Sequence, residues 1–198
     1  MRWAVLLFLL CGPVGLNATA SAKHGPHISE HSLWPDQYCL EAWGGGAIPL
    51  SPRGPSSFAV DYVRAVTGGG GLYARWGTWG LGVEGMQAQF GHQHLDHTSL
   101  TFAAGAVVLE KLVLFEEGEN EGLFLKAGAG WGQGQLDSIY PGAHAWSAPA
   151  GLLAIGYRLP LFSHLELNFI ASSWSMLSDG TWDPLAIGDL GVQVGIPW

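Results

Sequence analysis

The last ten residues of the chain, Asp189–Trp198 (DLGVQVGIPW), alternate between bulky apolar and small or polar side chains. One parity of this segment carries Leu190, Val192, Val194, Ile196 and Trp198. The other parity carries Asp189, Gly191, Gln193, Gly195 and Pro197. Because successive side chains of a strand point to opposite faces, the pattern predicts a strand with one face toward lipid and the other toward a lumen. Pro197 lacks a backbone donor, but it lies near a strand end, where proline is tolerated.

Related alternation recurs throughout the chain. The strand-like segments are 38–48, 57–76, 81–90, 97–114, 123–132, 152–159, 165–172 and 189–198. The second joins two shorter candidates across Gly68–Gly71, which we interpret as a bulge or kink. We join them because bacterial single-chain barrels have an even number of strands. The sequence therefore predicts an all-β fold, an eight-stranded antiparallel transmembrane up-and-down β-barrel with a filled polar lumen.

The composition supports this fold. Only 12% of the 198 residues are charged, while 30 are glycine and 10 are tryptophan. Beyond the amino-terminal segment, no apolar run approaches the ~20 residues that a membrane helix needs. A chain this apolar without such a helix is expected to place its apolar residues on the outer face of a closed barrel. The net charge of −8 disfavours nucleic acid as a partner.

The amino-terminal segment has the features of a secretory signal peptide. Arg2 precedes the apolar run Trp3–Leu10, and the small residues of Ala18–Ala22 offer cleavage after Ala20 or Ala22. We predict a signal peptide at 1–22, a mature tail at 23–36 and the barrel at 37–198. Such a signal implies export to an oxidising compartment, in which Cys39 has no second cysteine to pair with.

The expected connections alternate in length. With the amino terminus in the periplasm, short turns at 77–79, 115–121 and 160–164 are periplasmic. The connections at 49–56, 91–97, 134–147 and 175–186 face outside and are longer on average, as in outer-membrane barrels. Many tryptophans fall near strand ends, where interfacial girdles form: Trp43, Trp76, Trp79, Trp146, Trp174, Trp182 and Trp198.

Charged residues occupy the small-residue parity of several strands. They are Arg75, Glu84, Lys126, Arg158, Glu166 and Asp189. An eight-stranded barrel is just wide enough for side chains to fill it, and buried charges have to be paired. We therefore predict an ion-pair network that closes the lumen, with a narrow pore as the alternative.

From about Tyr38 to Trp198 the chain resembles eight-stranded barrels of the OmpA transmembrane-domain type. The similar motifs are Gly70–Gly77 (GGLYARWG), Leu81–Gly85 (LGVEG) and Leu123–Gly132 (LFLKAGAGWG). The resemblance implies that Trp198, Ile196 and Val194 form the signal read by the barrel-insertion machinery. It also implies a monomer in the outer membrane of a Gram-negative bacterium, in contact with lipid including lipopolysaccharide.

A second resemblance is to lipid A deacylases, outer-membrane barrels whose penultimate strand carries a His-x-Ser pair with an acidic partner further on. The matching segment here is Ala171–Met176 (ASSWSM), in which Ser175 aligns with the serine, and Asp183 or Asp189 with the acid. The histidine position is Ser173, so the base that would activate the serine is missing. Ser99, next to His97-Thr98, is a second candidate nucleophile.

His92, His94, Asp96 and His97 have side chains of the types that ligate zinc or copper. Histidines in loops are usually just solvated, and we predict neither a metal nor a cofactor.

The sequence is best interpreted as a non-enzymatic outer-membrane barrel with a structural or surface-binding role. The alternatives are a lipid A-modifying hydrolase and a narrow pore. The outer-loop groups expected to contact a ligand are Ser138, Tyr140, His144, Trp146, Trp182 and Asp183.

Overall fold

The computed structural model describes residues 34–50, 62–92, 99–115, 121–137, 144–177 and 184–198. These residues form eight strands. In chain order they are β1 (Gln37–Pro49), β2 (Tyr62–Trp76), β3 (Trp79–His92), β4 (Ser99–Phe115), β5 (Gly122–Asp137), β6 (His144–Phe162), β7 (Leu165–Met176) and β8 (Leu185–Pro197). Among the described residues, no helix is long and apolar enough to cross a bilayer.

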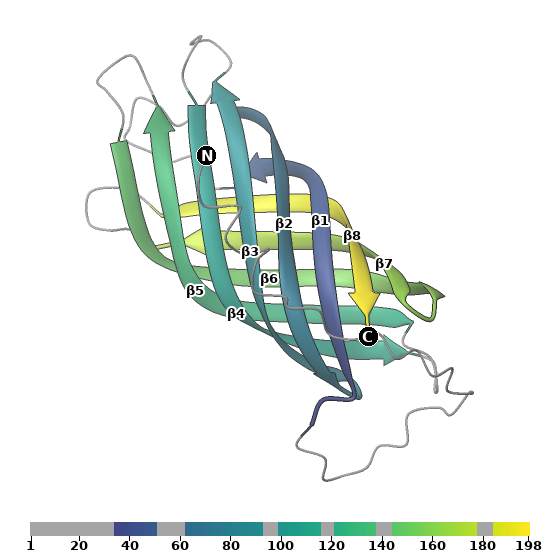
Figure 1. Ribbon diagram of the computed structural model, residues 1–198. Coiled ribbons are helices and arrows are strands. Elements are labelled where there is room, and N and C mark those ends of the chain that lie inside the picture. Colours follow the sequence, from purple (N-terminus) through teal and green to yellow (C-terminus); the bar gives the residue numbers. More distant parts are fainter. Residues whose placement is uncertain (1–33, 51–61, 93–98, 116–120, 138–143, 178–183) are drawn as a thin grey trace, which may run out of the picture.

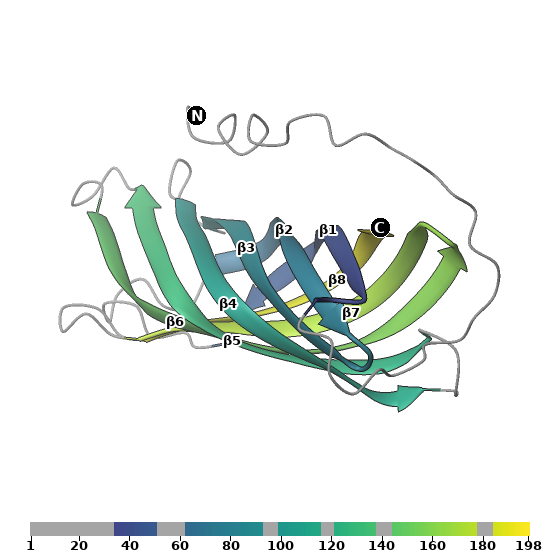
Figure 2. The ribbon, with the colours of Figure 1, turned by 60° about the horizontal axis from the view of Figure 1, so that its bottom comes forward.

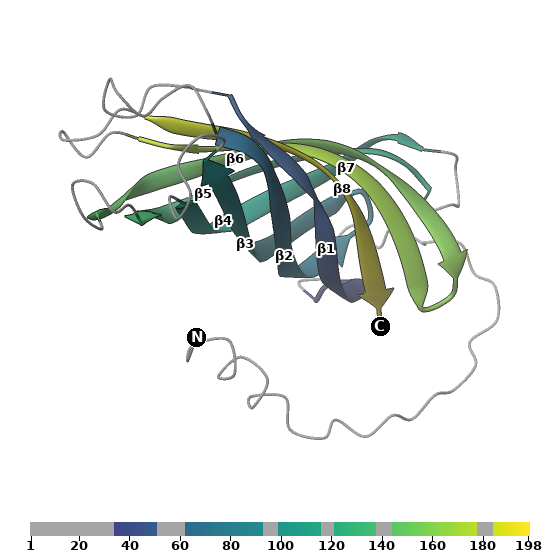
Figure 3. The same ribbon diagram turned by 90° about the horizontal axis from the view of Figure 1, so that it is seen from above.

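The strands close into a barrel in which each pairs antiparallel with its neighbours in sequence and β8 returns to β1. Figure 1 shows this order, and Figure 3 shows β1 lying between β2 and β8. The closing seam continues to the last residue, because Tyr38 and Trp198 exchange backbone hydrogen bonds of 3.1 and 2.9 Å. The predicted eight-stranded antiparallel barrel is therefore confirmed.

The two ends of the barrel differ in their connections. We call the end that carries the connections at 77–78, 116–121 and 163–164 the turn end; it also holds the beginning of β1 and the end of β8. The opposite end, with connections at 50–61, 93–98, 138–143 and 177–184, is the loop end. The strands run obliquely between the two ends (Figure 2).

Side chains alternate between an apolar outer wall and a filled interior. In β5, Phe124 and Lys126 are buried while Leu125 between them is 43% exposed. In β8, Val194 and Ile196 face outward, and the inward Gln193 is fully buried. The predicted parities of these strands are thus correct.

The glycine run Gly68–Gly71 differs from the prediction. It lies within the single strand β2, as expected, but it pairs with β1 without interruption. The register shift of β2 against β3 lies between Val63 and Val66 instead. The run is therefore not a bulge.

Some of the inward glycines make room for large side chains on the neighbouring strand. Gly69 is the register partner of Trp43, and a Cβ on it would lie 2.8 Å from the indole ring. Gly134 stands in the same relation to Trp146, at 2.2 Å. In an eight-stranded barrel the interior holds such rings only where the facing positions are small. The small-residue parity is thus a packing requirement.

The interior consists of two parts. Toward the loop end lies what we call the apolar core: Trp43, Ala47, Met86, Ala88, Phe90, Leu100, Phe102, Leu136, Trp146, Ala148, Leu152, Trp174, Met176 and Ile187. Toward the turn end lies what we call the ion cluster: Glu41, Arg75, Glu84, Glu110, Lys126, Arg158 and Glu166. The predicted polar filling is thus concentrated in the turn-end half.

Several sequence-based boundaries shift in the structure, because most strands are longer than predicted and β2 begins at Tyr62 rather than at 57. Most of the predicted loop at 134–147 is strand: β5 continues to Asp137, and β6 begins at His144 with Leu136 as its register partner. The predicted turn at 160–164 is shortened, because β6 continues to Phe162. Alternation weakens at strand ends, which explains why these extensions were missed.

Three of the tryptophans assigned to interfacial girdles lie inside the barrel instead. Trp43, Trp146 and Trp174 are buried in the apolar core. Trp79 and Trp198, on the other parity, are on the outer wall at the turn end. Proximity to a strand end does not decide the location of a tryptophan; the face that it shares with its neighbours does.

Candidate functional site

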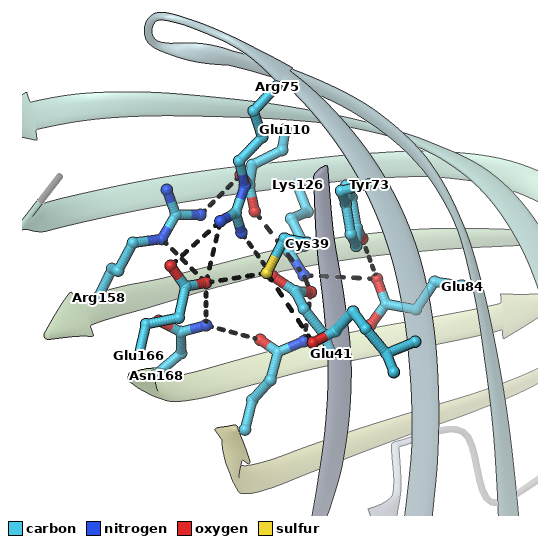
Figure 4. A network of polar contacts seen from close by, with 12 residues as sticks. Cys39, Glu41, Tyr73, Arg75, Glu84, Glu110, Lys126, Arg158, Glu166 and Asn168 are labelled. Atoms are coloured by element: carbon cyan, nitrogen blue, oxygen red, sulfur yellow. Dashed lines mark hydrogen bonds and ion pairs between the residues drawn. The ribbon is translucent and has the colours of Figure 1, made fainter. Parts of the chain in front are cut away.

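Arg75, near the end of β2, is the centre of the ion cluster (Figure 4). Its Nη2 lies 2.6 Å from Glu41 Oε1, and its Nε lies 3.0 Å from Glu110 Oε1. Its Nη1 donates to both oxygens of Glu166, at 3.0 and 3.1 Å. One planar guanidinium therefore joins carboxylates from β1, β4 and β7, a task that suits the fixed fork of arginine donors.

Lys126 of β5 forms the second centre. Its Nζ lies 2.7 Å from Glu41 Oε2, 3.6 Å from Glu84 Oε2 and 3.8 Å from Glu110 Oε2. The ammonium also lies 4.4 Å from the centroid of the Tyr73 ring. A compact charge with three donors can serve several carboxylates at once, and the aromatic face adds attraction where water is excluded.

Arg158 of β6 completes the set of cations. Its Nη2 donates to Glu110 Oε1 at 2.6 Å, and its Nε lies 3.6 Å from Glu166 Oε1. Its guanidinium carbon lies 5.3 Å from the centroid of the Phe124 ring.

Neutral groups surround the charges. The Tyr73 hydroxyl donates to Glu84 Oε2 at 2.6 Å, and Asn168 Nδ2 lies 3.4 Å from Glu166 Oε1. Gln193 Nε2 of β8 donates to Glu41 Oε2. With Gln193 included, every strand of the barrel contributes a side chain to this network.

The network fixes the register of the barrel. Its charged side chains are at most 5% exposed. A slip of one residue in any of the strands β1 to β7 would move that strand's charge to the outer face. Removing one partner from a buried ion pair typically costs about 3–5 kcal/mol, because the remaining charge is uncompensated. The cluster holds three cations against four carboxylates, so no cation in it is left without a partner.

The structure brings together five of the six predicted lumen charges: Arg75, Glu84, Lys126, Arg158 and Glu166. Asp189 is also buried and inward-facing, but it accepts a hydrogen bond from Ser172 rather than an ion pair. Glu41 and Glu110 are central and were missed. Glu41 shares its parity with Cys39 and Trp43, so the alternation of β1 contained the signal.

Cys39, Glu41 and Glu166 hold potential metal-ligand atoms within 4.8 Å of one another. Both carboxylates already bind Arg75, and the Cys39 thiol lies 3.5 Å from Glu166 Oε1. Two members of the trio thus belong to the ion cluster, and Cys39 lies against it.

The three predicted insertion-signal residues lie on the outer wall, with Val194, Ile196 and Trp198 being 42%, 49% and 60% exposed. The Trp198 ring stacks on Tyr38 at 6.3 Å between centroids. The terminal aromatic thus lies on the seam between β8 and β1.

The predicted outer-loop residues are only partly described. Trp146, expected to be exposed, is instead buried in the apolar core of the barrel. His144 is the first residue of β6. Ser138, Tyr140, Trp182 and Asp183 lie outside the described residues, as do the histidines at 94 and 97 and the predicted signal peptide.

The candidate nucleophile Ser175 lies apart from Asp189, the one candidate acid within the described residues. Ser175 of β7 is on the exposed outer face, whereas Asp189 of β8 is buried on the inner face. The wall of the barrel separates the two side chains, so they do not form a catalytic pair. Ser99 is the first residue of β4, opposite Asp137 of β5.

No family model matches the sequence, and no curated protein matches it significantly. Solved structures do resemble the fold. Neisserial surface protein A superposes with a TM-score of 0.63 at 11% identity, over 80% of this chain and 96% of that chain. Ail, the attachment invasion locus protein of Yersinia pestis, solved with the heparin analogue sucrose octasulfate, gives 0.52 at 14% identity, over 82% and 98%. The chain thus has the fold of the small eight-stranded outer-membrane barrels.

Proposed function

We propose that this protein is an outer-membrane barrel of a Gram-negative bacterium, with a structural or surface-binding role carried by its loop end. The observation that carries the proposal is the inverted distribution of side chains. The outer wall is apolar, and the charges of the ion cluster are inside. In lipid this arrangement leaves apolar groups against acyl chains and every strand paired, as membrane-spanning barrels require.

The outer wall is too apolar for water. Leu153, Leu190 and Val66 are 68%, 71% and 80% exposed, and such residues surround the barrel. Proteins in water rarely expose contiguous apolar patches larger than about 300–600 Å². In lipid the same side chains contact acyl chains, so no apolar surface of the wall is exposed to water.

Both borders of the apolar wall carry side chains of the types found at a membrane–water interface. At the turn end the outer wall carries the aromatic residues Trp79, Tyr38 and Trp198. Toward the loop end of β3 to β5 the outward positions become polar: Gln87, Gln89, Thr101, Gln133 and Gln135. Aromatic residues favour the membrane–water interface. The amides support a loop end that projects beyond the bilayer.

The projecting part of β4, β5 and β6 contains a groove of about 270 Å³ whose lining includes Thr101, Gln133, Gln135 and Ser147. Hydroxyl and amide groups of this kind bind polar partners through hydrogen bonds. The chain has a net charge of −8, so a polyanion such as the sulfated sugar bound by Ail is a poor match. The groove supports surface recognition of an uncharged or cationic polar partner.

Cell fractionation tests the location. When the protein is expressed in a Gram-negative host, we expect it in the outer-membrane fraction, migrating differently on SDS gels before and after boiling. A variant lacking Trp198 is expected to reach the outer membrane in smaller amounts, because the proposed insertion signal is damaged. Recovery of the full chain as a soluble periplasmic protein would contradict the proposal.

Cysteine labelling tests the orientation. Tyr140→Cys, in a loop-end connection, is expected to react with an impermeant maleimide on intact cells. His164→Cys, in the turn between β6 and β7, is the matched control and should react only after the outer membrane is permeabilised. Native Cys39 is buried and provides the internal standard for unreacted thiol. Labelling of His164→Cys alone on intact cells would reverse the orientation.

A further inference from the structure

The outer wall is hollowed by a groove of about 590 Å³ that crosses β3 to β7. Its walls are the large outward side chains Trp79, Leu109, Leu125, Leu153 and Ile155. Its floor holds the small outward residues Ala127, Ala171 and Ser173. The hollow lies where these small outward side chains adjoin the larger outward leucines, isoleucine and tryptophan of the same and neighbouring strands.

The groove rises obliquely from the turn end. One register row runs across the groove from Trp79, the first residue of β3. Its next members, on β4 to β7, are Lys111, Leu125, Ile155 and Ala171. This row takes four interstrand steps of about 4.8 Å, or about 19 Å in all. Trp79 lies at the very edge of the turn end, whereas Ile155 lies seven residues before the end of β6. With a tilt of about 40°, seven residues correspond to a depth of about 15–18 Å, close to half of a ~30 Å hydrocarbon core.

A cation stands at the shallow end of the groove. Among the residues whose side chains the structure describes, Lys111 is the one Lys or Arg on the outer wall. Its Nζ donates to Thr78 Oγ1 at 2.7 Å and lies 4.2 Å from the centroid of the Trp79 ring. These two contacts hold the ammonium at the rim and leave it donors for an anion.

We infer that this groove binds one glycerophospholipid of the periplasmic leaflet, with its phosphate at Lys111 and an acyl chain along Ala127 toward Ser173. The inference rests on the proposed membrane location and orientation. Three features of the groove fit this occupant. Its lining is apolar over a depth that matches one leaflet, its cation stands at the level of the head groups, and an aromatic ring lies beside that cation at the interface.

The test measures retention of phosphatidylglycerol by the purified, folded barrel in native mass spectrometry. Ala127→Leu fills the floor of the groove and is expected to lower phosphatidylglycerol retention more than tenfold. Ala42→Leu makes the same change on the outer wall of β1, outside the groove, and should leave retention unchanged. Lys111→Gln is expected to reduce the preference for phosphatidylglycerol over phosphatidylcholine by about fivefold, because the lysine attracts an anionic head group.

Each result supports or overturns the inference. Equal retention by the wild type, Ala127→Leu and Ala42→Leu would show ordinary lipid contact around the barrel and overturn it. Retention of lipopolysaccharide in place of phosphatidylglycerol, lost in Ala127→Leu, would also overturn it by assigning the groove to the other leaflet. A barrel that reaches the outer membrane but fails this test leaves the proposed function intact, whereas a soluble protein fails the fractionation test.

Discussion

The two halves of the barrel interior are both filled by side chains, but the side chains are of different types. Toward the loop end the lumen is filled by tryptophan, phenylalanine, methionine and leucine. Toward the turn end it is filled by seven charged side chains, their polar neighbours and a few apolar groups such as Phe124 and Leu112. Both halves exclude solvent from their side chains, so an apolar filling closes an eight-stranded barrel as well as a polar one does.

The halves differ in what they specify. In the loop-end half of β3 to β5 the outward side chains include Gln87, Thr101 and Gln133, so a strand that slips by one residue there exchanges apolar side chains for uncharged polar ones. In the turn-end half the same slip would move a charge such as Lys126 to the outer face and away from its buried partners, at a cost of about 3–5 kcal/mol. The ion cluster therefore sets the register, and the apolar core adds packing to strands already aligned.

The largest expected effect is that of Arg75→Met. It leaves Glu41, Glu110 and Glu166 without their shared cation, and we expect a loss of about 5 kcal/mol in the free energy of unfolding. Urea unfolding in lipid vesicles measures it. Arg75→Lys, which keeps the charge but not the three-way fork, should lie between this variant and the wild type. A loss under about 1 kcal/mol for Arg75→Met would mean that the cluster does not hold the strands together.

Leu152→Ala tests the apolar core. Leu152 is 2% exposed, and its truncation leaves a cavity that is expected to cost about 3 kcal/mol in the same urea assay. The next residue of β6, Leu153, is 68% exposed on the outer wall and provides the control. Acyl chains can fill the space left by Leu153→Ala, so the loss in the free energy of unfolding should be under about 1 kcal/mol. Similar costs at both positions would indicate that the core is loosely packed.

Gly69→Ala tests the fit between the inward tryptophans and their facing glycines. Its Cβ would lie 2.3 Å from the Gly85 carbonyl oxygen and 2.8 Å from the Trp43 indole, and we expect a loss of about 2 kcal/mol. Gly44→Ala is the control, because its Cβ would meet only the Thr67 carbonyl oxygen at 3.8 Å. Trp43 fluorescence should shift in Gly69→Ala alone, and identical stability of the two variants would exclude this packing role.

The barrel itself was predictable from the sequence because alternation is a local property. Parity in 123–132 and 189–198 places each side chain on the correct face. Parity also identifies most of the ion cluster, since a charge on the inward, small-residue face of a barrel strand has to be paired inside. Glu110 was missed because it lies in a long apolar strand with little alternation around it, Ala103–Leu114.

The division of the interior into two halves was not predictable in the same way. This division depends on which inward residues of the eight strands lie at the same level along the barrel axis. That level is set by the register of every pair of neighbouring strands. Trp43 and Trp146 come together with Met176 only through pairings far apart in sequence. The outer groove has the same origin, because Ala127 and Ser173 are brought into one row by Leu153 of β6.

Ser172→Ala has the smallest expected effect and probes the border between the halves. Asp189 lies on the inner face of β8 between Ile187 of the apolar core and Gln193 beside the ion cluster. Ser172 Oγ donates to its Oδ1, and no hydrogen bond reaches its Oδ2 from the described residues. Losing a hydrogen bond to a charged group is expected to cost about 1.5 kcal/mol.

A double-mutant cycle with Asp189→Asn separates the charge from the hydrogen bond. Asparagine keeps an acceptor without a charge, so Ser172→Ala should cost only about 0.5 kcal/mol in that background. Equal costs in the two backgrounds would mean that Asp189 carries no charge in the folded barrel. The ion cluster would then be the only charged part of the described interior, and the border between the halves would be sharper than the side-chain types suggest.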